Sequence, residues 1–397
     1  MMKKNLLFVI DSLDVAGAEK SLVTLLSLLD YKKYNVDLLL FSHGSLLEKL
    51  VPKEVTILPP LKYTKFSNLS VKKSLQTAVK KSEYKMLYAR FRYSVMLRSN
   101  KHSNIVKARL FWESVGNVIE ELPKKYDIAI SYAQGIPTYF VAEKVKATKK
   151  FAWVNASYHL NKKERQFQLP YYEKYEKIVA VSDTAKNILL EVFPEYAERI
   201  KVIYDINNPI FINDMAKIGK GYSDDFSGIK ILTIGRLSQS KGYDIALEAC
   251  KQLKESGVNF RWYVLGKGPL KHEIEEFITE HELTDHFVLL GVKANPYPYL
   301  LNADFYVQTS RFEGFGLAIA EARMLNIPVV TTKFDSVFNQ MKDGKNGLVV
   351  EMNANGVASA IVKLVENPEL KENIKQYLRL EKKGNIEEIQ KFYQLIS

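Results

Sequence analysis

The sequence predicts an α/β protein made of two doubly wound parallel sheets, and two patterns carry this prediction. Short apolar runs rich in β-branched residues alternate with helical patterns in both halves of the chain, which is typical of βα units. A polar, irregular stretch at 207–228 interrupts the alternation and is typical of a linker. The length of 397 residues also suits two domains better than one.

The first domain is expected to span residues 1–206. Seven apolar runs predict its strands, and the long gap after the third run is expected to hold basic helices. Because helical patterns separate the runs, the strands are expected to be parallel. The predicted strands are 5–10, 36–41, 55–58, 127–131, 151–154, 178–181 and 201–203.

The second domain is expected at 229–380 and repeats the same alternation. A last helix is predicted at 381–397, where Ile389, Phe392 and Ile396 share one face that must be buried. We expect this helix to pack on the first domain. The strands predicted for the second domain are 230–234, 262–265, 287–290, 305–308, 328–332 and 348–350.

The composition is that of a globular protein, with 47% hydrophobic and 26% charged residues. Cys250 is the single cysteine, which excludes an intramolecular disulfide and a cysteine-rich metal cluster. The apolar run near the N-terminus is too short for a signal peptide or a membrane span. We therefore expect a cytoplasmic protein, with peripheral binding to the inner face of the cell membrane as a further expectation.

The net charge of +12 is concentrated in one part of the chain. Residues 61–110 contain 13 Lys and Arg and a single acid, Glu83, so this stretch alone carries as much net charge as the whole chain. Its apolar and aromatic residues recur every three or four positions, which predicts amphipathic helices with a basic face. An anionic membrane surface is one candidate partner, and ordinary solvated helices are the alternative. No nucleic-acid motif accompanies the charge, so nucleic acid is not an expected partner.

A glycine-rich turn follows the strand predicted at 305–308. It contains Gly314 and Gly316, and a helix is predicted to begin directly after it. Glycines let the backbone approach a ligand closely, and the first N–H groups of a helix have no partner inside it, so a phosphate fits such a place. Glu321 lies inside the helix, roughly 7 to 8 Å from its start, where it can accept hydrogen bonds from ribose hydroxyls. The alternative is a purely structural turn with Glu321 exposed.

With Glu313 included, this segment resembles the family 4 retaining glycosyltransferases, whose hallmark is two glutamates separated by seven residues. The resemblance is dense from about 230 to 350 and thin before 126. It implies a GT-B fold, in which two Rossmann-like domains face each other across a cleft, and transfer of a sugar from a nucleotide diphosphate sugar. It also implies that Glu313 holds a hydroxyl of that sugar. The donor-binding residues implied at this turn are Gly314, Phe315, Gly316, Leu317 and Glu321.

A second segment of the family pattern ends the first strand of the second domain. Gly235 and Arg236 follow that strand, and Lys241 comes shortly after; the resemblance implies that the Arg and the Lys grip the donor diphosphate. Two cations can neutralise a departing diphosphate without a metal ion. No Asp-x-Asp follows a strand and no histidines have metal-ligand spacing, so we expect no metal and no other cofactor. Solvated side chains at a helix start are the alternative.

Two further glycine turns follow strands of the second domain. They contain Gly266 and Gly291, and the second continues into Val292. Similar family positions line the nucleobase pocket, which implies donor contacts by Gly266 and Val292. Plain connections between a strand and a helix are an equally good interpretation.

In the first domain the resemblance points to two loops and contains two departures. Gly17 opens a helix after the first strand, where the family usually has two adjacent glycines and this chain has Ala16 in the other place. Asn155 stands where many relatives have a histidine near the donor sugar. Asparagine forms hydrogen bonds but cannot carry a proton, so a general base at this position is in doubt. His159 is a candidate substitute or a surface residue.

The resulting hypothesis is an enzyme, a retaining hexosyltransferase. It moves a hexose from a UDP-sugar to a glycan or lipid-linked acceptor in the synthesis of a capsule or cell-wall polysaccharide. The resemblance implies that the acceptor attacks from the face that the phosphate leaves, with charge stabilisation and positioning by Arg236, Lys241 and Glu313. The alternatives are a nucleotide-sugar epimerase of the same architecture and a basic protein that binds membranes or nucleic acid.

Overall fold

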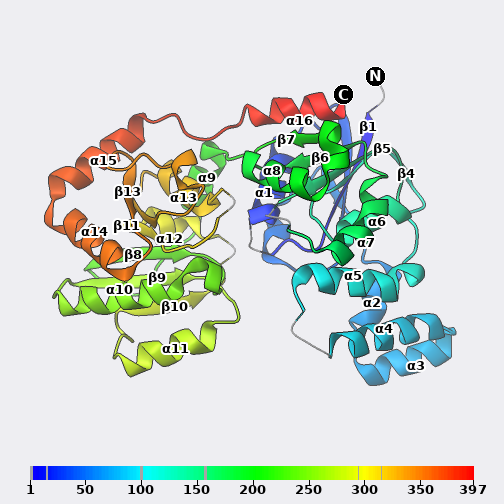
Figure 1. Ribbon diagram of the computed structural model, residues 1–397, viewed down its shortest axis with the longest axis horizontal. Coiled ribbons are helices and arrows are strands. Elements are labelled where there is room, and N and C mark those ends of the chain that lie inside the picture. The colour runs from blue at the N-terminus through cyan, green and yellow to red at the C-terminus, as the bar shows by residue number, and fades with distance from the viewer. Residues whose placement is uncertain (1–2, 15–16, 99–101, 156–158, 294, 314) are drawn as a thin grey trace. The chain divides into compact units, whose positions relative to one another are not determined.

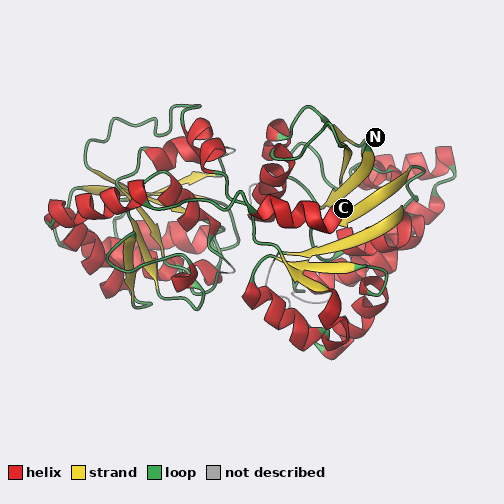
Figure 2. Cartoon of the chain, turned by 90° about the horizontal axis from the view of Figure 1, so that it is seen from above, coloured by secondary structure: helices red, strands yellow, loops and turns green. Residues whose placement is uncertain are grey.

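The computed structural model describes residues 3–397 apart from 15–16, 99–101, 156–158, 294 and 314. The chain forms two compact units, Met1–Asp205 with Glu387–Ser397, and Ile206–Ile386. Each unit is a parallel β-sheet with helices on both faces (Figures 1 and 2). The α/β class predicted from the sequence is therefore confirmed. None of the described helices is both long enough and apolar enough to span a membrane.

The first unit contains a seven-stranded parallel sheet in the order β3-β2-β1-β4-β5-β6-β7. Its strands lie close to the predicted positions. The fifth begins earlier than predicted, because residues 146–150 include three lysines and a threonine, none of them buried, and so form no apolar run, although the segment pairs with β4. The strands are β1 (Lys4–Ile10), β2 (Tyr34–Leu40), β3 (Val55–Ile57), β4 (Lys125–Ser131), β5 (Lys146–Val154), β6 (Lys177–Ala180) and β7 (Ile200–Val202).

Aromatic side chains fill much of the core of the first unit. Trp153 on β5 stacks on Tyr132 with ring centroids 5.2 Å apart, and Tyr139 packs against Trp112. All four are buried. The preferred geometry of the ring contacts therefore helps to fix how the helices pack on the sheet, in addition to the apolar area that the rings bury. The helices around this core are α1 (Gly17–Ser27), α5 (Asn104–Val115), α6 (Ile136–Lys144), α7 (Lys162–Tyr172) and α8 (Asp183–Val192), with short 3₁₀ turns η1 (Leu46–Leu50), η2 (Gly116–Val118) and η3 (Pro194–Arg199).

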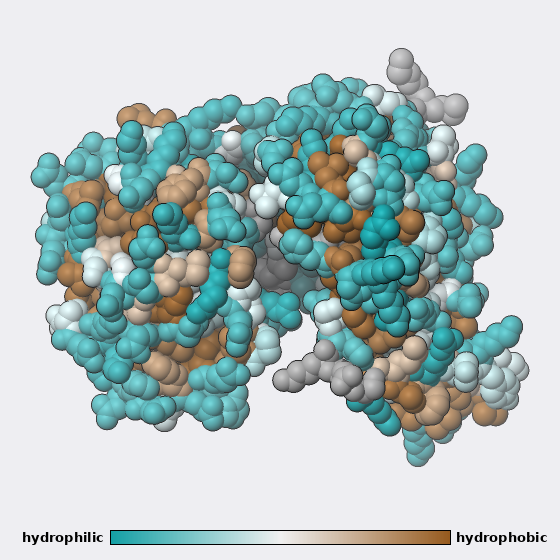
Figure 3. Space-filling view, in the orientation of Figure 1, coloured by the Kyte–Doolittle hydropathy of each residue, from teal (hydrophilic) through white to brown (hydrophobic). Residues whose placement is uncertain are grey.

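Between β3 and α5, where basic helices were expected without a number or bounds, the described residues form α2 (Lys62–Ser67), α3 (Val71–Lys81) and α4 (Tyr84–Leu97). Ser70 caps the start of α3, and Ser82 ends it in the left-handed conformation, which turns the chain into α4. On its inner side α4 packs Tyr93 against Phe111 of α5 at 5.3 Å. On its outer side hydrophobic side chains stay at the surface, seen over α3 and α4 at the lower right of Figure 3.

The second unit contains a six-stranded parallel sheet in the order β10-β9-β8-β11-β12-β13. All six predicted strands are present, in β8 (Ile229–Ile234), β9 (Phe260–Leu265), β10 (Phe287–Gly291), β11 (Phe305–Gln308), β12 (Val329–Thr332) and β13 (Gly347–Val350). Trp262 on β9 is fully buried at the centre of the core. The helices are α10 (Tyr243–Glu255), α11 (Lys271–Glu280), α12 (Tyr297–Leu301), α13 (Leu317–Met324), α14 (Ala354–Glu366) and α15 (Pro368–Leu380), with 3₁₀ turns η4 (Gln239–Lys241) and η5 (Val337–Asn339).

The stretch predicted as a linker, 207–228, is structured and belongs to the second unit, which corrects that prediction. Its helix α9 (Pro209–Ala216) packs against α12 and α13. Asn208 caps the helix and Pro209 occupies its first turn, so a dipeptide typical of a turn marks a helix start here. Further on, Asp224 accepts hydrogen bonds from Arg261 at 2.8 Å and from the Tyr263 hydroxyl at 2.7 Å.

The C-terminal helix α16 (Glu388–Ile396) lies in the first unit. Phe392 stacks on Phe8 of β1 with centroids 6.1 Å apart, and the Tyr393 hydroxyl donates to the Leu28 carbonyl at 3.1 Å. The return to this unit begins at residue 387 rather than 381. Residues before it remain on the second unit, where Glu381 pairs with Arg323 at 2.7 Å.

Candidate active site

The strand order of the second unit reverses between β8 and β11. These two strands are neighbours, with β9 and β10 on one side and β12 and β13 on the other. The loops that leave their carboxyl ends therefore diverge, and ligands of doubly wound sheets bind in the crevice at such a switch point. Most of the second-domain residues singled out in the sequence lie on these two loops.

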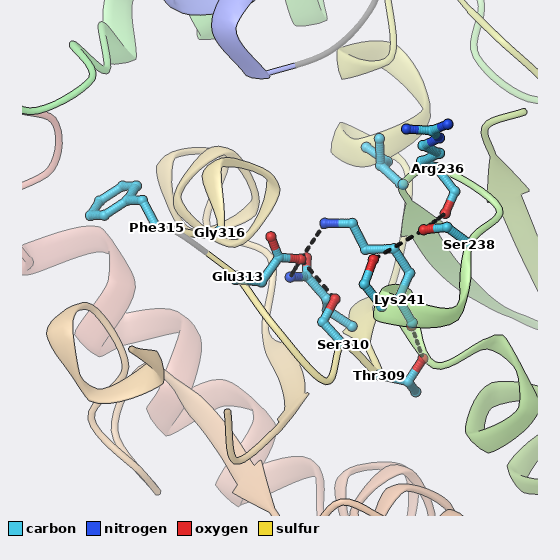
Figure 4. A network of polar contacts seen from close by, with 12 residues as sticks. Arg236, Ser238, Lys241, Thr309, Ser310, Glu313, Phe315 and Gly316 are labelled. Atoms are coloured by element: carbon cyan, nitrogen blue, oxygen red, sulfur yellow. Dashed lines mark hydrogen bonds and ion pairs between the residues drawn. The ribbon is translucent and has the colours of Figure 1, made fainter. Parts of the chain in front are cut away.

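Glu313, on the loop after β11, is the centre of a polar network (Figure 4). Its Oε1 accepts hydrogen bonds from Gln308 Nε2 and Ser310 Oγ, each at 2.7 Å, and forms an ion pair with Lys241 Nζ. Ser336 Oγ donates to its backbone carbonyl at 2.9 Å. The side chains of Glu313 and Lys241 are 11% and 26% exposed, so the carboxylate is held in one orientation while both groups remain accessible.

The amide of Gln308 is itself oriented by Tyr306. The Tyr306 hydroxyl donates to Gln308 Oε1 at 2.6 Å, which leaves Nε2 to donate to Glu313. Complete burial is the main cause that raises the pKa of Tyr306 well above its usual value, so the phenol stays protonated and remains a donor.

The loops after β8 and β11 are joined by close backbone contact and by side chains. Gly242 has φ +63°, and a Cβ there would lie 2.1 Å from the Thr309 carbonyl oxygen, so only glycine fits. Thr309 Oγ1 donates to the Lys241 carbonyl at 3.0 Å. Arg311 forms two hydrogen bonds to Asp244, at 2.8 and 2.6 Å. These contacts fix Lys241 relative to Glu313.

A similar close approach joins the turns after β8 and β9. A Cβ on Gly266 would lie 1.9 Å from the Gly235 carbonyl oxygen, and one on Gly268 would lie 2.2 Å from the Leu237 carbonyl oxygen. Gly266 and Gly268 are therefore required by packing. Gly235 itself has room for a Cβ, whose nearest neighbour would be the Tyr243 hydroxyl at 3.6 Å.

Helix α13 begins beside the Glu313 network. Gly316 precedes it with φ +80° and offers no capping side chain, so the first N–H groups of the helix, at Leu317 and Ala318, have no partner inside it. Gln340 Nε2 donates to the carbonyl oxygens of Phe315 and Gly316 from the other side. A helix start without a side-chain cap suits an anion.

Glu321 is buried inside α13 and is contacted by α12. The Tyr297 hydroxyl donates to Glu321 Oε1 at 3.0 Å. Burial, and then the Glu321 carboxylate, raise the pKa of Tyr297 well above its usual value, so the hydroxyl remains a donor. The prediction considered an exposed Glu321 as its alternative, and that alternative is wrong because the side chain is almost fully buried.

The positive groups of the site are Lys241 and Arg236. Arg236 is exposed, and in Figure 4 its guanidinium extends away from Glu313, whereas the Lys241 ammonium points at it. Within the described part of the chain, no three His, Cys, Asp or Glu side chains lie close enough together to hold a metal ion. The arrangement offers two cations, a helix start without a side-chain cap and two positioned carboxylates.

Residues 225–381 match the model of a protein family described as glycosyl transferases group 1. The matched segment covers both loops and both carboxylates, and it accounts for most of the second unit. The second unit is therefore similar to group 1 glycosyl transferases over these residues. The match spans less than half of the chain and leaves the first unit outside it.

Curated relatives carry glycosyltransferase names. An uncharacterized glycosyltransferase of Methanocaldococcus jannaschii is 31% identical over 213 residues, which are 51% of this chain and 55% of the relative. The N-acetylgalactosamine-N,N'-diacetylbacillosaminyl-diphospho-undecaprenol 4-alpha-N-acetylgalactosaminyltransferase of Campylobacter jejuni is 29% identical over 209 residues, 51% and 54%. An amylovoran biosynthesis glycosyltransferase of Erwinia amylovora is 29% identical over 145 residues, 34% and 36%. The chain spans about half or less of the length of these relatives.

Solved structures resemble the whole chain. Anabaena HepE in complex with UDP-glucose has a TM-score of 0.66 at 18% identity, with 99% of each chain covered. A variant of S. aureus TarM, solved with UDP, has a TM-score of 0.66 at 16% identity and the same coverage. At these identities the likeness establishes the fold, and the prediction of two Rossmann-like units of the GT-B class is confirmed.

The predicted residues of the second unit are distributed unevenly around the crevice. Glu313, Lys241 and Gly316 lie at the switch point, with Gly235, Gly266, Leu317 and Glu321 on the elements that border it. Val292 follows β10, the outermost strand on its side of the sheet. Figure 4 shows the Phe315 ring pointing away from the pair of Lys241 and Glu313. Gly314 lies outside the described residues.

Three predicted residues belong to the first unit, at the carboxyl ends of its own strands. Gly17 is the first residue of α1. Asn155 follows β5, and its Nδ2 donates to the Tyr132 carbonyl at 2.6 Å, while its Oδ1 is buried without a partner among the described residues. His159 is exposed in the loop before α7.

Several residues of the Glu313 network were not singled out in the sequence. They are Gln308, Ser310, Ser336 and Tyr306. Tyr297, which contacts Glu321, was not singled out either. Gln308 had a detectable signal, because it is a polar residue that ends an otherwise apolar strand. Ser336 and Tyr297 had none, since they approach the site from segments that follow other strands.

Proposed function

We propose that this chain is a retaining glycosyltransferase. It takes a hexose from a UDP-sugar and joins it to a glycan or a lipid-linked acceptor during synthesis of a surface polysaccharide. In this proposal the reaction needs no metal ion, because side chains supply the positive charge. The observation that carries the proposal is the Glu313 network at the switch point of the second unit.

Glu313 supports the proposal because its carboxylate is oriented before a ligand binds. Lys241, Gln308 and Ser310 all donate to the same oxygen, Oε1. The partly exposed carboxylate can therefore accept a hydrogen bond from a sugar hydroxyl without having to lose rotamer freedom on binding.

The surroundings of Glu313 suit the diphosphate of a nucleotide sugar. Negative charge develops on the diphosphate as its bond to the sugar breaks, and donors already in place stabilise that charge. The start of α13 supplies backbone N–H groups. Lys241 has three donor hydrogens, so it can contact a phosphate while it still donates to Glu313. Arg236 is exposed and free to close on the phosphate from the loop after β8.

The proposed reaction balances without a protein nucleophile. The acceptor oxygen forms a bond to the anomeric carbon on the face from which the diphosphate departs. The bond between that carbon and the phosphate oxygen breaks, and the proton of the acceptor hydroxyl moves to the departing phosphate oxygen. Glu313 then positions the sugar and forms no covalent intermediate.

The proposed donor and acceptor classes draw on related proteins. HepE was solved with UDP-glucose, which supports a UDP-sugar as the donor here. The Campylobacter relative is named for an undecaprenol-linked acceptor, and the Erwinia relative for amylovoran biosynthesis. These names support a lipid-linked or polymeric glycan as the acceptor.

Binding of UDP in the presence of EDTA tests the donor site. A ligand at a hundred times its dissociation constant stabilises a protein by about 2.7 kcal/mol, so UDP and the correct UDP-sugar should raise the unfolding temperature measurably. A panel of nucleotide sugars would identify the donor by the largest increase. Failure of UDP to stabilise the protein would contradict the proposal, and a strict need for Mg²⁺ would contradict its metal independence.

Two substitutions test the roles of the network. Glu313→Ala and Lys241→Ala should each lower the turnover number by at least about 100-fold, measured as UDP release from the donor that binds best. Lys271→Ala and Glu275→Ala are matched controls, because they form an exposed ion pair on α11 and should leave turnover unchanged. Near-normal turnover in either network variant would remove that residue from the mechanism.

The product distinguishes the proposal from its alternatives. Nuclear magnetic resonance of the product should show the anomeric configuration of the donor, and the opposite configuration would rule out the proposed attack. Conversion of the UDP-sugar into its epimer in the absence of an acceptor would favour an epimerase.

A further inference from the structure

Two neighbouring helices of the first unit expose apolar side chains that a globular core would bury. On α4, Tyr84, Tyr88 and Phe91 are 55%, 66% and 65% exposed, and Val95 is 45% exposed. At roughly 100° per residue these four side chains lie within about 60° of one another around the helix axis. They form a continuous stripe on the side of α4 opposite Tyr93, which packs inward on Phe111.

Helix α3 has a stripe of the same kind. Val71, Leu75 and Val79 recur every fourth residue and are 68%, 49% and 66% exposed. The buried face of this helix carries only small side chains, because its buried residues are Ser74 and Ala78. We call α3 and α4 with the turn between them the α3–α4 hairpin; the two helices contact each other. Two apolar stripes on neighbouring helices exceed the scattered exposure that is normal for a protein surface.

Cations border these stripes. Lys85 and Arg92 lie within roughly 60° of Tyr88 around α4, and Lys72 lies next to Val79 around α3. The hairpin also carries exposed Lys73, Lys80 and Lys81, and its single acid is Glu83. A protein partner would favour a surface poor in lysine. Apolar and aromatic side chains rimmed by lysine and arginine are instead typical of helices that lie on an anionic membrane.

We propose that the α3–α4 hairpin docks on the surface of an anionic lipid bilayer. Its apolar stripes enter the boundary between the headgroups and the acyl chains, and its cations contact the anionic headgroups. The phenol and phenyl rings of α4 suit this boundary, where aromatic rings are enriched. The inference rests on residues of the first unit alone and holds whether or not the second unit transfers a sugar.

Flotation with lipid vesicles tests the proposal on the full chain. The protein should float with vesicles of phosphatidylcholine and phosphatidylglycerol, should not float with phosphatidylcholine alone, and should be released by high salt. Replacing Lys72, Lys85 and Arg92, which border the apolar stripes, with glutamate should weaken binding at least about tenfold, because each cation near the membrane surface contributes to the attraction. Replacing Tyr84, Tyr88 and Phe91 with serine should weaken it at least as much.

A second charge-reversed variant controls for net charge. Replacing Lys220, Lys345 and Lys363 with glutamate changes the net charge equally, but these exposed lysines lie in the second unit. This variant should float as the unaltered protein does. Equal loss of binding in both charge variants would overturn the proposal.

The serine variant also separates the membrane from a protein partner. It removes side chains that contribute little to the core, so its thermal unfolding should match that of the unaltered chain. If the unaltered chain forms a dimer by light scattering that the serine variant lacks, and neither binds vesicles, the apolar surface is an interface between two copies and the proposal is wrong.

Discussion

The Glu321 carboxylate shows how one residue of the site depends on another that is distant in the sequence. It lies inside α13, and the hydroxyl of Tyr297, from the start of α12, donates to its Oε1 at 3.0 Å. Both side chains are buried, so the pair has little freedom to rearrange. In the proposed function this contact orients the carboxylate toward the ribose of the donor, which makes Tyr297 a positioning residue.

Replacing Tyr297 with phenylalanine should therefore weaken UDP binding. We expect the dissociation constant of UDP to rise about tenfold, or 1.4 kcal/mol, since a hydrogen bond to a charged group contributes about this much. The affinity for pyrophosphate should not change, because the lost contact concerns the ribose. Isothermal titration calorimetry with both ligands measures the difference.

The chain offers a matched control for this change. Tyr263 also donates to a carboxylate, that of Asp224, at 2.7 Å in another part of the same unit. Tyr263→Phe removes a comparable hydrogen bond and should leave UDP binding unchanged. If both variants bind UDP equally weakly, or if Tyr297→Phe also loses pyrophosphate, Tyr297 only supports the fold.

At the scale of elements, the site depends on how closely the turns after the strands approach one another. The turns after β8 and β9 touch through Gly235 and Gly266, and the loops after β8 and β11 touch through Gly242 and Thr309. Side chains larger than hydrogen would separate these backbones. The glycines therefore set the distance between adjacent loops, and the loops carry Lys241 and Glu313.

The two glycines of the first contact should respond differently to alanine. Gly266→Ala places a Cβ 1.9 Å from the Gly235 carbonyl oxygen, so it should destabilise the second unit by about 1–3 kcal/mol. Gly235→Ala meets nothing closer than 3.6 Å and should leave stability nearly unchanged. Urea unfolding followed by hydrogen exchange in peptides of the second unit measures both changes.

The outcome for UDP binding separates two roles of Gly235. If Gly235 contacts the donor as predicted, Gly235→Ala should weaken UDP binding without a loss of stability. Equal destabilisation by the two substitutions would show that the backbone contact is not what requires glycine at 266.

At the scale of the whole molecule, the chain passes from the first unit to the second and back again. It leaves the first unit after Asp205 and returns to it at Glu387. The returning helix α16 buries Ile389, Phe392 and Ile396 in the first unit. Phe392 contacts both Phe8 and Trp153, with centroids 6.1 and 6.0 Å away, so the last residues of the chain complete the core formed by the first ones.

Removing the Phe392 ring should weaken the first unit selectively. Phe392→Ala should lower its stability by about 3–5 kcal/mol, the usual range for a buried phenylalanine, with the second unit unchanged. Hydrogen exchange resolved by peptide distinguishes the units. Gln394→Ala, an exposed change on the same helix, should cost less than about 0.5 kcal/mol. Equal weakening of both units would show that their stabilities are coupled.

The sequence by itself determined the α/β class, the strands found in the described residues and the two loops that carry Lys241 and Glu313. These features can be recognised from short stretches of sequence, since a buried parallel strand is a continuous apolar run and a turn that binds a ligand closely needs glycine. The boundary at 207–228 was predicted wrongly for a local reason as well. Asn208 and Pro209 occur both in turns and at helix starts, and only packing of α9 against α12 and α13 decides between them.

Only the tertiary structure decided what surrounds each carboxylate and which apolar residues are buried. Ser336 reaches Glu313, and Tyr297 reaches Glu321, from segments that follow other strands, so no spacing in the sequence predicts these contacts. Tyr88 and Tyr93 lie on one helix and are equally aromatic, yet Tyr93 packs against Phe111 while Tyr88 is 66% exposed. Periodicity defines the faces of a helix, but the neighbouring elements determine which face is covered.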